Sequence, residues 1–320
     1  MGYARRATVD ITFNGAAVSD KLESFSYTDS ADGESDRISI QVNNVDGKWT
    51  GAWMPSKGSV LVPTIHFDGQ NLSCGAHILD SFSASGGSSS TCSIGAVSVP
   101  ADEGFRATNR TKTWEKVTLA QIGAEVADRA GVAFSFHADD IFINSREQNE
   151  EPDCSFLNKI ATTYGYIMKA YNNKIVVFDP KRYERLAPVK TLTPADLSSW
   201  SYQTQLDGTY TGAKIAYTNS GTGETIDVQI GSGNRILSLN EKADSIGDAE
   251  LIAKGKLAAE NRKIETVSLS KMMDLRLVSG CPIQLSGFGR IDGKYMILKA
   301  DHSIGNGATT SVEAYKIDGT

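Results

Sequence analysis

Residues 25–42 read FSYTDSADGESDRISIQV, and this stretch decides the fold of the N-terminal third. Apolar residues occupy every second position on both sides of a polar centre (Phe25 and Tyr27; Ile38, Ile40 and Val42). A period of two predicts strands with one apolar face each. The polar run 29–34 between them predicts a turn. The segment therefore indicates antiparallel β structure.

The same alternation continues outward from this stretch through the first hundred residues. Short alternating runs occur at residues 9–13, 65–67, 77–82 and 91–99. The last two flank a Ser/Gly-rich run, 83–90, which predicts a hairpin tip. We therefore expect residues 1–104 to form one β domain.

The middle of the chain predicts helices. Thr118 and Gln121 form a capping box ahead of apolar residues at helical spacing, and Gly131 ends that pattern. A second helix is predicted to start near Asp153 or Ser155, and a hairpin to turn at Tyr171-Asn172-Asn173. Residues 105–190 are therefore expected to form a small α+β domain.

The last third returns to alternating patterns at 213–217 and 226–230, and again between 267 and 315. One helix is predicted from about 248 to 262, with a cap at Ser245 or Asp248. Residues 191–320 are therefore expected to form a second β domain with one helix. The fold class predicted for the whole chain is α+β, mostly β.

Charge and hydropathy exclude several classes of protein. The 320 residues contain 32 Lys and Arg against 38 Asp and Glu, a formal net charge of −6. Mild acidity disfavours a nucleic-acid-binding surface over the whole molecule. No apolar run is long enough for a transmembrane helix, and the alternating N-terminus predicts a strand in place of a signal peptide. We expect a chain that does not use the general export route.

Motifs for catalysis and metal binding are missing from the sequence. There is no GxxxxGK[ST] phosphate loop, no GxSxG nucleophile motif and no CxxC pair. His66 and His77 are able to face each other on a hairpin around Asp68-Gly69, but two ligands make a weak metal site. The cysteines are expected to be reduced, mostly buried thiols (Cys74, Cys92, Cys154 and Cys281). The sequence predicts no catalytic residues, no metal ligands and no cofactor.

Two acidic clusters and two tryptophans remain as candidates. Glycoside hydrolysis needs a pair of carboxyl groups, which the acids of 139–153 would supply (Asp139, Asp140, Glu147, Glu150, Glu151 and Asp153). A second cluster would attract calcium, although its spacing differs from an EF-hand loop (Asp29, Asp32, Glu34 and Asp36). We interpret both clusters as solvated loops, the first also complementing a helix dipole. Trp49 and Trp53 are interpreted as loop anchors or interface residues, with a sugar platform as the alternative.

Motifs along nearly the whole chain resemble contractile-tail baseplate hub proteins, the late control protein D family of phages, prophages and phage-tail-like particles. Near the N-terminus they are the two halves of the opening stretch (25–29 and 33–40), Asp46-Gly47-Lys48-Trp49 and Pro55-Ser56-Lys57-Gly58. Further motifs follow in order (Lys112-Thr113-Trp114, Thr118-Leu119, 148–151, Asp153, Phe156-Leu157, Ala161, Tyr164-Gly165, Gly287-Phe288-Gly289, Asp292-Gly293-Lys294-Tyr295 and His302). Each motif alone is weakly specific, and their order and spacing carry the resemblance.

The resemblance implies two tail-tube-like β-barrel domains with a small α+β domain between them. It implies a homotrimer that adapts a sixfold tail tube to a threefold central spike. Tube protein, spike protein, tape-measure protein and other baseplate proteins are the implied partners, with no membrane insertion and no stable nucleic-acid binding, although DNA can pass through the channel. The implied location is the tail baseplate of a virion or tail-like particle assembled in the host cytoplasm.

No enzymatic activity is implied, because the chain has no length to spare for a fused lysozyme or peptidase. Two alternatives stay open at this point. One is a peptidoglycan- or carbohydrate-active enzyme built on β domains with acids from 139–153. The other is a sugar-binding module that uses Trp49 and Trp53.

Overall fold

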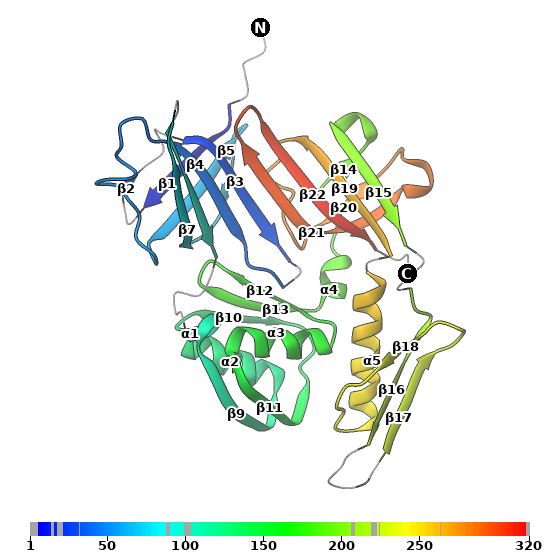
Figure 1. Ribbon diagram of the computed structural model, residues 1–320. Coiled ribbons are helices and arrows are strands. Elements are labelled where there is room, and N and C mark those ends of the chain that lie inside the picture. The colour runs from blue at the N-terminus through cyan, green and yellow to red at the C-terminus, as the bar shows by residue number, and fades with distance from the viewer. Residues whose placement is uncertain are drawn as a thin grey trace.

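The computed structural model describes residues 6–13, 16–17, 22–31, 33–87, 90–98, 104–205, 209–218, 223, 225–262 and 264–317. Strands predominate over helices, which confirms the expected α+β, mostly β class (Figure 1). Two of the Ser residues in the predicted hairpin tip, 88 and 89, lie outside the described residues.

One 14-stranded sheet takes strands from both ends of the chain. The N-terminal β unit, within residues 6–98, supplies β1 (Thr8–Phe13), β2 (Ala16–Ala17), β3 (Leu22–Ser30), β4 (Arg37–Asn43), β5 (Val60–Phe67), β6 (Gln70–Ser73), β7 (His77–Ser85) and β8 (Thr91–Val97). The C-terminal β unit, within 190–205 and 264–317, supplies β14 (Thr191–Leu192), β15 (Ser199–Thr204), β19 (Glu265–Met272), β20 (Pro282–Leu285), β21 (Gly293–Ile304) and β22 (Ala308–Lys316). Short 3-10 helices lie at Pro194–Asp196 and Gly289–Ile291.

The two β units meet where β21 pairs antiparallel with β3, so that Ser303 lies opposite Ser26. The strand order is β15-β19-β22-β21-β3-β4-β8-β7-β5-β1-β2. Within the described ranges this path does not close on itself, so the two β-barrel domains stay a prediction. One hydrophobic core centres on Phe25 and Trp49 of the N-terminal unit and also takes in Met273 and Leu275 of the C-terminal unit. A second core centres on Tyr295 and Leu269 of the C-terminal unit.

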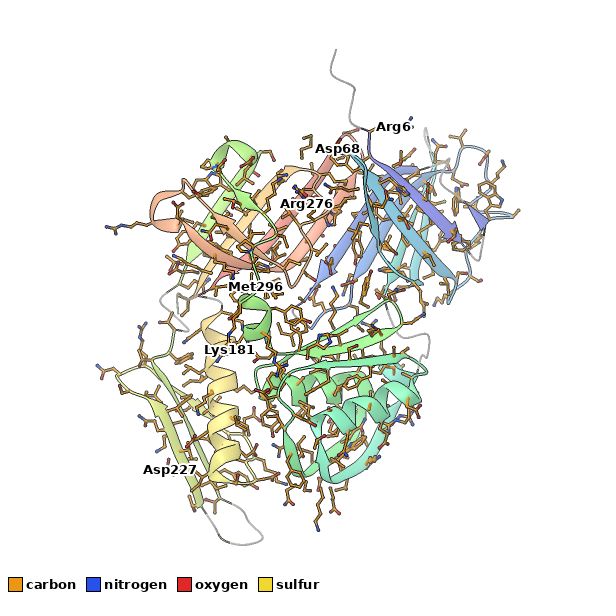
Figure 2. The ribbon with its side chains drawn as sticks, turned by 180° about the vertical axis from the view of Figure 1, so that it is seen from behind. Arg6, Asp68, Lys181, Asp227, Arg276 and Met296 are labelled. Carbon is orange, nitrogen blue, oxygen red and sulfur yellow. The ribbon has the colours of Figure 1, made fainter. Side chains whose placement is uncertain are left out.

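The α/β unit lies below the shared sheet in Figure 1 and comprises the described residues of 104–184 and 209–262. Its first segment contains α1 (Gly104–Ala107), β9 (Asn109–Thr118), α2 (Leu119–Arg129), β10 (Ala133–His137), β11 (Phe142–Pro152), α3 (Asp153–Thr163), β12 (Ile167–Tyr171), β13 (Lys174–Phe178) and α4 (Pro180–Glu184). Its second segment contains β16 (Gly212–Thr218), β17 (Thr225–Gly231), β18 (Ile236–Leu239) and α5 (Ile246–Asn261). From behind, Lys181 on α4 lies where this unit meets the sheet (Figure 2).

One hydrophobic core joins the two segments of the α/β unit, because Ile215 and Ile252 pack in the same cluster as Leu119 and Phe156. That core therefore draws on residues from both sides of the predicted boundary at 190. The predicted division into 1–104, 105–190 and 191–320 stays a prediction.

Local signals in the middle of the chain are confirmed. The capping box of Thr118 and Gln121 starts α2, and α3 begins at Asp153. The β12–β13 hairpin turns through Asn172 and Asn173, both with positive φ, a backbone region that asparagine tolerates well. Ser245, one of the two predicted caps, is the N-cap of α5.

The acidic run before α3 is a strand. We interpreted it as a solvated loop, which is wrong for residues 142–152, because β11 pairs along its length with β9. Its inner side chains Ile143 and Gln148 are buried, so tertiary pairing outweighs the charged composition of the run.

Candidate functional site

The shared sheet has one polar face, which short hydroxyl side chains cover from one β unit to the other. The register places residues of adjacent strands directly opposite one another, and such residues share a face. One row crosses seven strands through Ser81, Gly95, Ser39, Ser26, Ser303, Thr309 and Met272. A parallel row contains Ser83, Ser93, Gln41 and Ser24. The face is therefore continuous across the junction of the two units.

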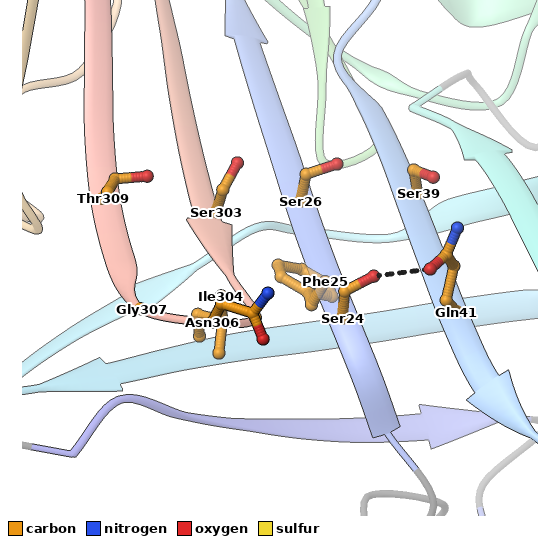
Figure 3. Close-up of a pocket in the computed structure, with 11 residues that line it drawn as sticks. Ser24, Phe25, Ser26, Ser39, Gln41, Ser303, Ile304, Asn306, Gly307 and Thr309 are labelled. Carbon is orange, nitrogen blue, oxygen red and sulfur yellow. Dashed lines mark hydrogen bonds between the residues drawn. The ribbon is translucent and has the colours of Figure 1, made fainter.

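A shallow groove of about 480 Å³ lies on this face at the junction (Figure 3). Ser24, Ser26 and Ser39 line one side of it, with Ser303 and Thr309 on the other. Ser24 Oγ donates to Gln41 Oε1 at 3.3 Å. Hydroxyl and amide groups of this kind stay hydrated and carry no net charge, so the groove offers a wetted, electrically neutral surface.

Charged side chains on the polar face occur with partners of opposite sign. Lys299 lies directly opposite Glu313 on the neighbouring strand, and Thr28 lies between Arg37 and Asp301. Thr28 Oγ1 donates to Asp301 Oδ1. Alternating signs cancel each other's field at short range, so these residues add little net potential to the face.

A buried ionic cluster, the junction cluster, joins all three units: Asp29 and Asp36 of the N-terminal β unit, Lys169 of the α/β unit and Ser279 of the C-terminal β unit. Lys169 Nζ contacts Asp29 Oδ1 and lies 3.3 Å from Asp36 Oδ1. Ser279 donates its backbone N–H to Asp29 Oδ2 at 2.7 Å and its hydroxyl to Asp29 Oδ1 at 2.7 Å. A single carboxylate thus holds parts of the chain that are 140 and 250 residues away from it.

Asp36 is the more deeply buried carboxylate, with a side-chain exposure of 0%. It accepts hydrogen bonds from Tyr27 Oη and from the backbone N–H of Ser30, both at 3.0 Å. Our interpretation of this acidic group as a solvated loop is therefore wrong for Asp29 and Asp36. Asp32, from the same predicted group, lies outside the described residues. A buried charge requires a partner, and the lysine that supplies it is distant in sequence.

In the junction cluster the pKa of one carboxylate is raised and the pKa of the other is lowered. Burial raises the pKa of Asp36 to about 6, although the charge of Lys169 opposes that rise. Burial acts to raise the pKa of Asp29 as well, but the charge of Lys169 and the hydrogen bonds from Lys169 and Ser279 outweigh it and leave that pKa below its ordinary value. The cluster therefore carries one excess negative charge at neutral pH and loses it on mild acidification.

We expect Asp36→Asn to remove a pH-dependent loss of stability. Because the folded-state pKa of Asp36 is raised, its favourable contribution is complete below 3.8 and disappears as pH rises through about 6. As pH rises from 4.5 to 7.5, the free energy of unfolding of the variant should therefore increase by roughly 2 kcal/mol relative to that of the wild type. Denaturant titrations at a series of pH values measure this difference.

The variant is compared with the wild type because buried histidines change the stability in the opposite direction as pH rises. Burial lowers the pKa of His77 to about 4, so its contribution is lost as pH falls below the ordinary value. That effect is common to both proteins and cancels in the difference. Asp128→Asn, at an exposed position on α2, serves as the matched control and should show no trend. A flat difference for Asp36→Asn would refute the assignment.

The sequence of this chain is similar to that of a phage baseplate protein. The chain is 28% identical over 214 residues to the probable baseplate hub protein of Escherichia phage P2, which covers 63% of this chain and 52% of the relative. The chain thus spans about half the length of the curated relative that it matches. No protein-family model matches it.

Solved structures share the fold over almost the full chain. A tail protein from Neisseria meningitidis MC58 has a TM-score of 0.77 at 14% identity, over 98% of this chain and 97% of that one. The 43 kDa tail protein of prophage MuSo2 from Shewanella oneidensis has a TM-score of 0.76 at 12% identity, over 97% and 98%.

A component of the type VI secretion system from E. coli, described as similar to the phage T4 tail proteins gp27 and gp5, has a TM-score of 0.66 at 11% identity, over 96% of this chain and 77% of that one. The sequence match and the shared fold agree. The chain is similar in sequence to a baseplate hub protein and in fold to tail proteins.

The predicted carboxylate candidates are dispersed over the α/β unit. Asp153 is buried and paired with Arg129 Nη2 at 2.8 Å and Arg110 Nε at 3.1 Å, which fixes the start of α3. Asp140 accepts from the backbone N–H of Ala120 at 3.0 Å, and Asp139 pairs with Arg182 at the surface. Glu147, Glu150 and Glu151 lie along β11. These acidic side chains therefore make separate structural contacts in β11, α2 and α3.

The two candidate histidines lie in different surroundings. His66 lies opposite Asn71 on the predicted hairpin and contacts Asp10 at 3.0 Å, whereas His77 is buried in β7 against the ring of Tyr27. Within the described ranges, no group of three or more His, Cys, Asp or Glu side chains is arranged to hold a metal ion.

Trp49 is buried and anchors its loop, and Trp53 packs edge-on against it with 39% of its surface exposed. The four cysteines are free thiols, two buried and two half-buried. Of the helices that the structure describes, none combines the length and the hydropathy needed to span a bilayer.

Sequence reasoning missed Lys169 as a functional residue. It lies just before the turn of the predicted hairpin at 171–173, where a single lysine in an otherwise apolar run is the only signal in the sequence. A charged residue in a strand with buried neighbours implies a buried partner, but nothing local identifies Asp29 or Asp36 as that partner.

Proposed function

We propose that this chain is a structural subunit of a contractile-tail baseplate hub and that three copies form a ring between a sixfold tail tube and a threefold central spike. The observation that carries the proposal is the shared sheet, in which one chain presents two β units side by side. Three such chains offer six β units in a ring. A threefold assembly can then match six equal neighbours, as a symmetry adapter must.

In this proposal each β unit acts as a tube-like domain and the α/β unit is an insertion between them. The hydroxyl-rich face lines the channel, because it is the polar face that both units share. A neutral, hydrated wall lets DNA and the tape-measure protein slide without sticking, since it offers no array of cations to bind phosphates. In this proposal the protein is located in the tail baseplate, where it contacts the tube, the spike and other baseplate proteins.

The proposed role is non-enzymatic. Its support is that the sequence relative and the fold relatives are tail and secretion-system components and that the predicted acids serve separate structural contacts. The junction cluster suits a subunit that must transmit force, because it joins three units with charge-assisted hydrogen bonds.

Native mass spectrometry of the purified chain tests the proposal. We expect a species of three times the chain mass of 34.4 kDa, held by obligate interfaces of more than about 2,000 Å² each. A protein that stays monomeric at micromolar concentration, in the presence and absence of tail tube protein, would refute it.

A further inference from the structure

We propose that copies of this chain join edge to edge, the outer edge of β15 in one copy pairing antiparallel with the outer edge of β7 in the next. The inference rests on the proposed ring and names the surfaces that would close it. It starts from two strand edges that lie at opposite ends of the eight strands β15-β19-β22-β21-β3-β4-β8-β7.

Both edges are exposed over about six residues. In β15, five of the six side chains are exposed, and only Tyr202 is half-buried. In β7, residues 80–85 are similarly exposed, because β5 pairs with this strand only at Ile78 and His77. No strand within the described ranges pairs with the outer side of either segment. Each edge thus presents unpaired backbone groups to solvent.

Neither edge carries the usual protection against aggregation. Natural edge strands are blunted by lysines, prolines or inward-facing charges. The β15 sequence, Ser199 to Thr204, contains no charged residue and no proline, and residues 80–85 contain one acid, Asp80, at a bulge. Edges of equal length without blunting residues are expected where a partner strand covers them.

The direction of the strands allows the two edges to meet. All seven junctions between the eight strands are antiparallel, so β15 and β7 run in opposite directions. Rotation about an axis along the strands brings β7 of one copy beside β15 of the next and continues the antiparallel ladder. Such a contact is heterologous and closes into a ring, whereas pairing β15 with itself leaves both β7 edges open.

The side chains at the two edges also match. Ser199 and Ser201 on β15 belong to the polar face, as do Ser81 and Ser83 on β7, so the hydroxyl rows continue across the contact. On the other face, Trp200 is 45% exposed and packs edge-on against Phe288 at 5.2 Å. A neighbouring strand would cover Trp200 with Phe82, an aromatic pair of the kind that stabilises strand contacts.

Paired cysteines test this contact in the full chain. Ser201→Cys is combined in turn with Ser81→Cys, Ser83→Cys and Ser85→Cys, which samples three registers on the polar face. After mild oxidation, a non-reducing gel should show most of one double variant in bands of two and three chains. Ser201→Cys combined with Ser39→Cys is the matched control, because Ser39 is exposed on the same face but on an inner strand, and it should stay uncrosslinked.

Each other outcome refutes the inference and separates it from the proposed function. If native mass spectrometry shows a trimer but none of the three double variants forms cross-linked bands, the edge contact is refuted and the proposed ring still stands. Dimers formed by Ser201→Cys alone show β15 pairing with itself, which overturns the heterologous contact. A monomer by native mass without cross-links overturns both proposals. The wild type, with its four native cysteines, reports any background.

Discussion

Replacing Lys169 with methionine is expected to lower the free energy of unfolding by about 3–5 kcal/mol. Methionine keeps the volume of the side-chain stem but leaves Asp29 and Asp36 buried beside each other without a counter-charge. Removing one partner of a buried ion pair costs far more than the pair contributes, because the remaining charge stays desolvated. Denaturant unfolding at pH 7.5 measures the loss.

Two further variants identify the cause of that loss. Lys174→Met, at an exposed lysine in the adjacent strand β13, should change the stability by less than about 0.5 kcal/mol. The double variant Lys169→Met with Asp36→Asn should recover part of the loss, because it removes one of the two like charges. An unchanged stability in Lys169→Met, or no recovery in the double variant, would contradict the role of the junction cluster.

Gly255→Ala is expected to destabilise the α/β unit by about 3 kcal/mol. Gly255 lies in α5 directly on the backbone at the end of α3, where an added Cβ would lie 2.3 Å from the carbonyl carbon of Tyr164 and 2.6 Å from the backbone nitrogen of Gly165. Backbone atoms cannot rotate away as a side-chain tip does, so α5 must shift. That shift also disturbs the hydrogen bond from Arg262 Nη2 to the carbonyl oxygen of Gly165, now 2.9 Å long.

The same helix provides the matched control for Gly255→Ala. Gly247, in the first turn of α5, has only Ser245 Oγ near its added Cβ, at 3.9 Å. Gly247→Ala should therefore stabilise the protein by about 0.5 kcal/mol, as alanine does in helices. Thermal unfolding of both variants gives opposite shifts in Tm, and equal shifts would contradict the close contact between α3 and α5.

Local structure could be predicted where the residues that decide it are neighbours in sequence. The capping box of Thr118 and Gln121 involves residues three apart, and the turn at Asn172 and Asn173 depends on two adjacent backbones. The alternation of Phe25 and Tyr27 with polar residues likewise predicts β3, because one side of that strand is buried. In each case propensity and tertiary packing favour the same conformation.

Structure that depends on distant partners could not be predicted from the sequence. The contact of β21 with β3 joins residues 269 to 279 positions apart, from Lys299 with Ser30 to Ile304 with Phe25, and hydrophobic pattern alone does not choose the neighbour of a strand. β11 was missed because its charged residues indicate a loop unless the pairing with β9 is known. Asp36 is of a residue type that is common in turns, and it is buried only because Lys169 reaches it.

The symmetry of the assembled ring tests the central claim most directly. Electron micrographs of the purified oligomer, averaged without imposed symmetry and viewed along the channel, should show six lobes with threefold rotational symmetry. Adjacent lobes should alternate between the N-terminal and the C-terminal β unit, with the hydroxyl-rich face toward the channel. A twofold particle, or a ring whose sheets turn that face outward, would contradict the account.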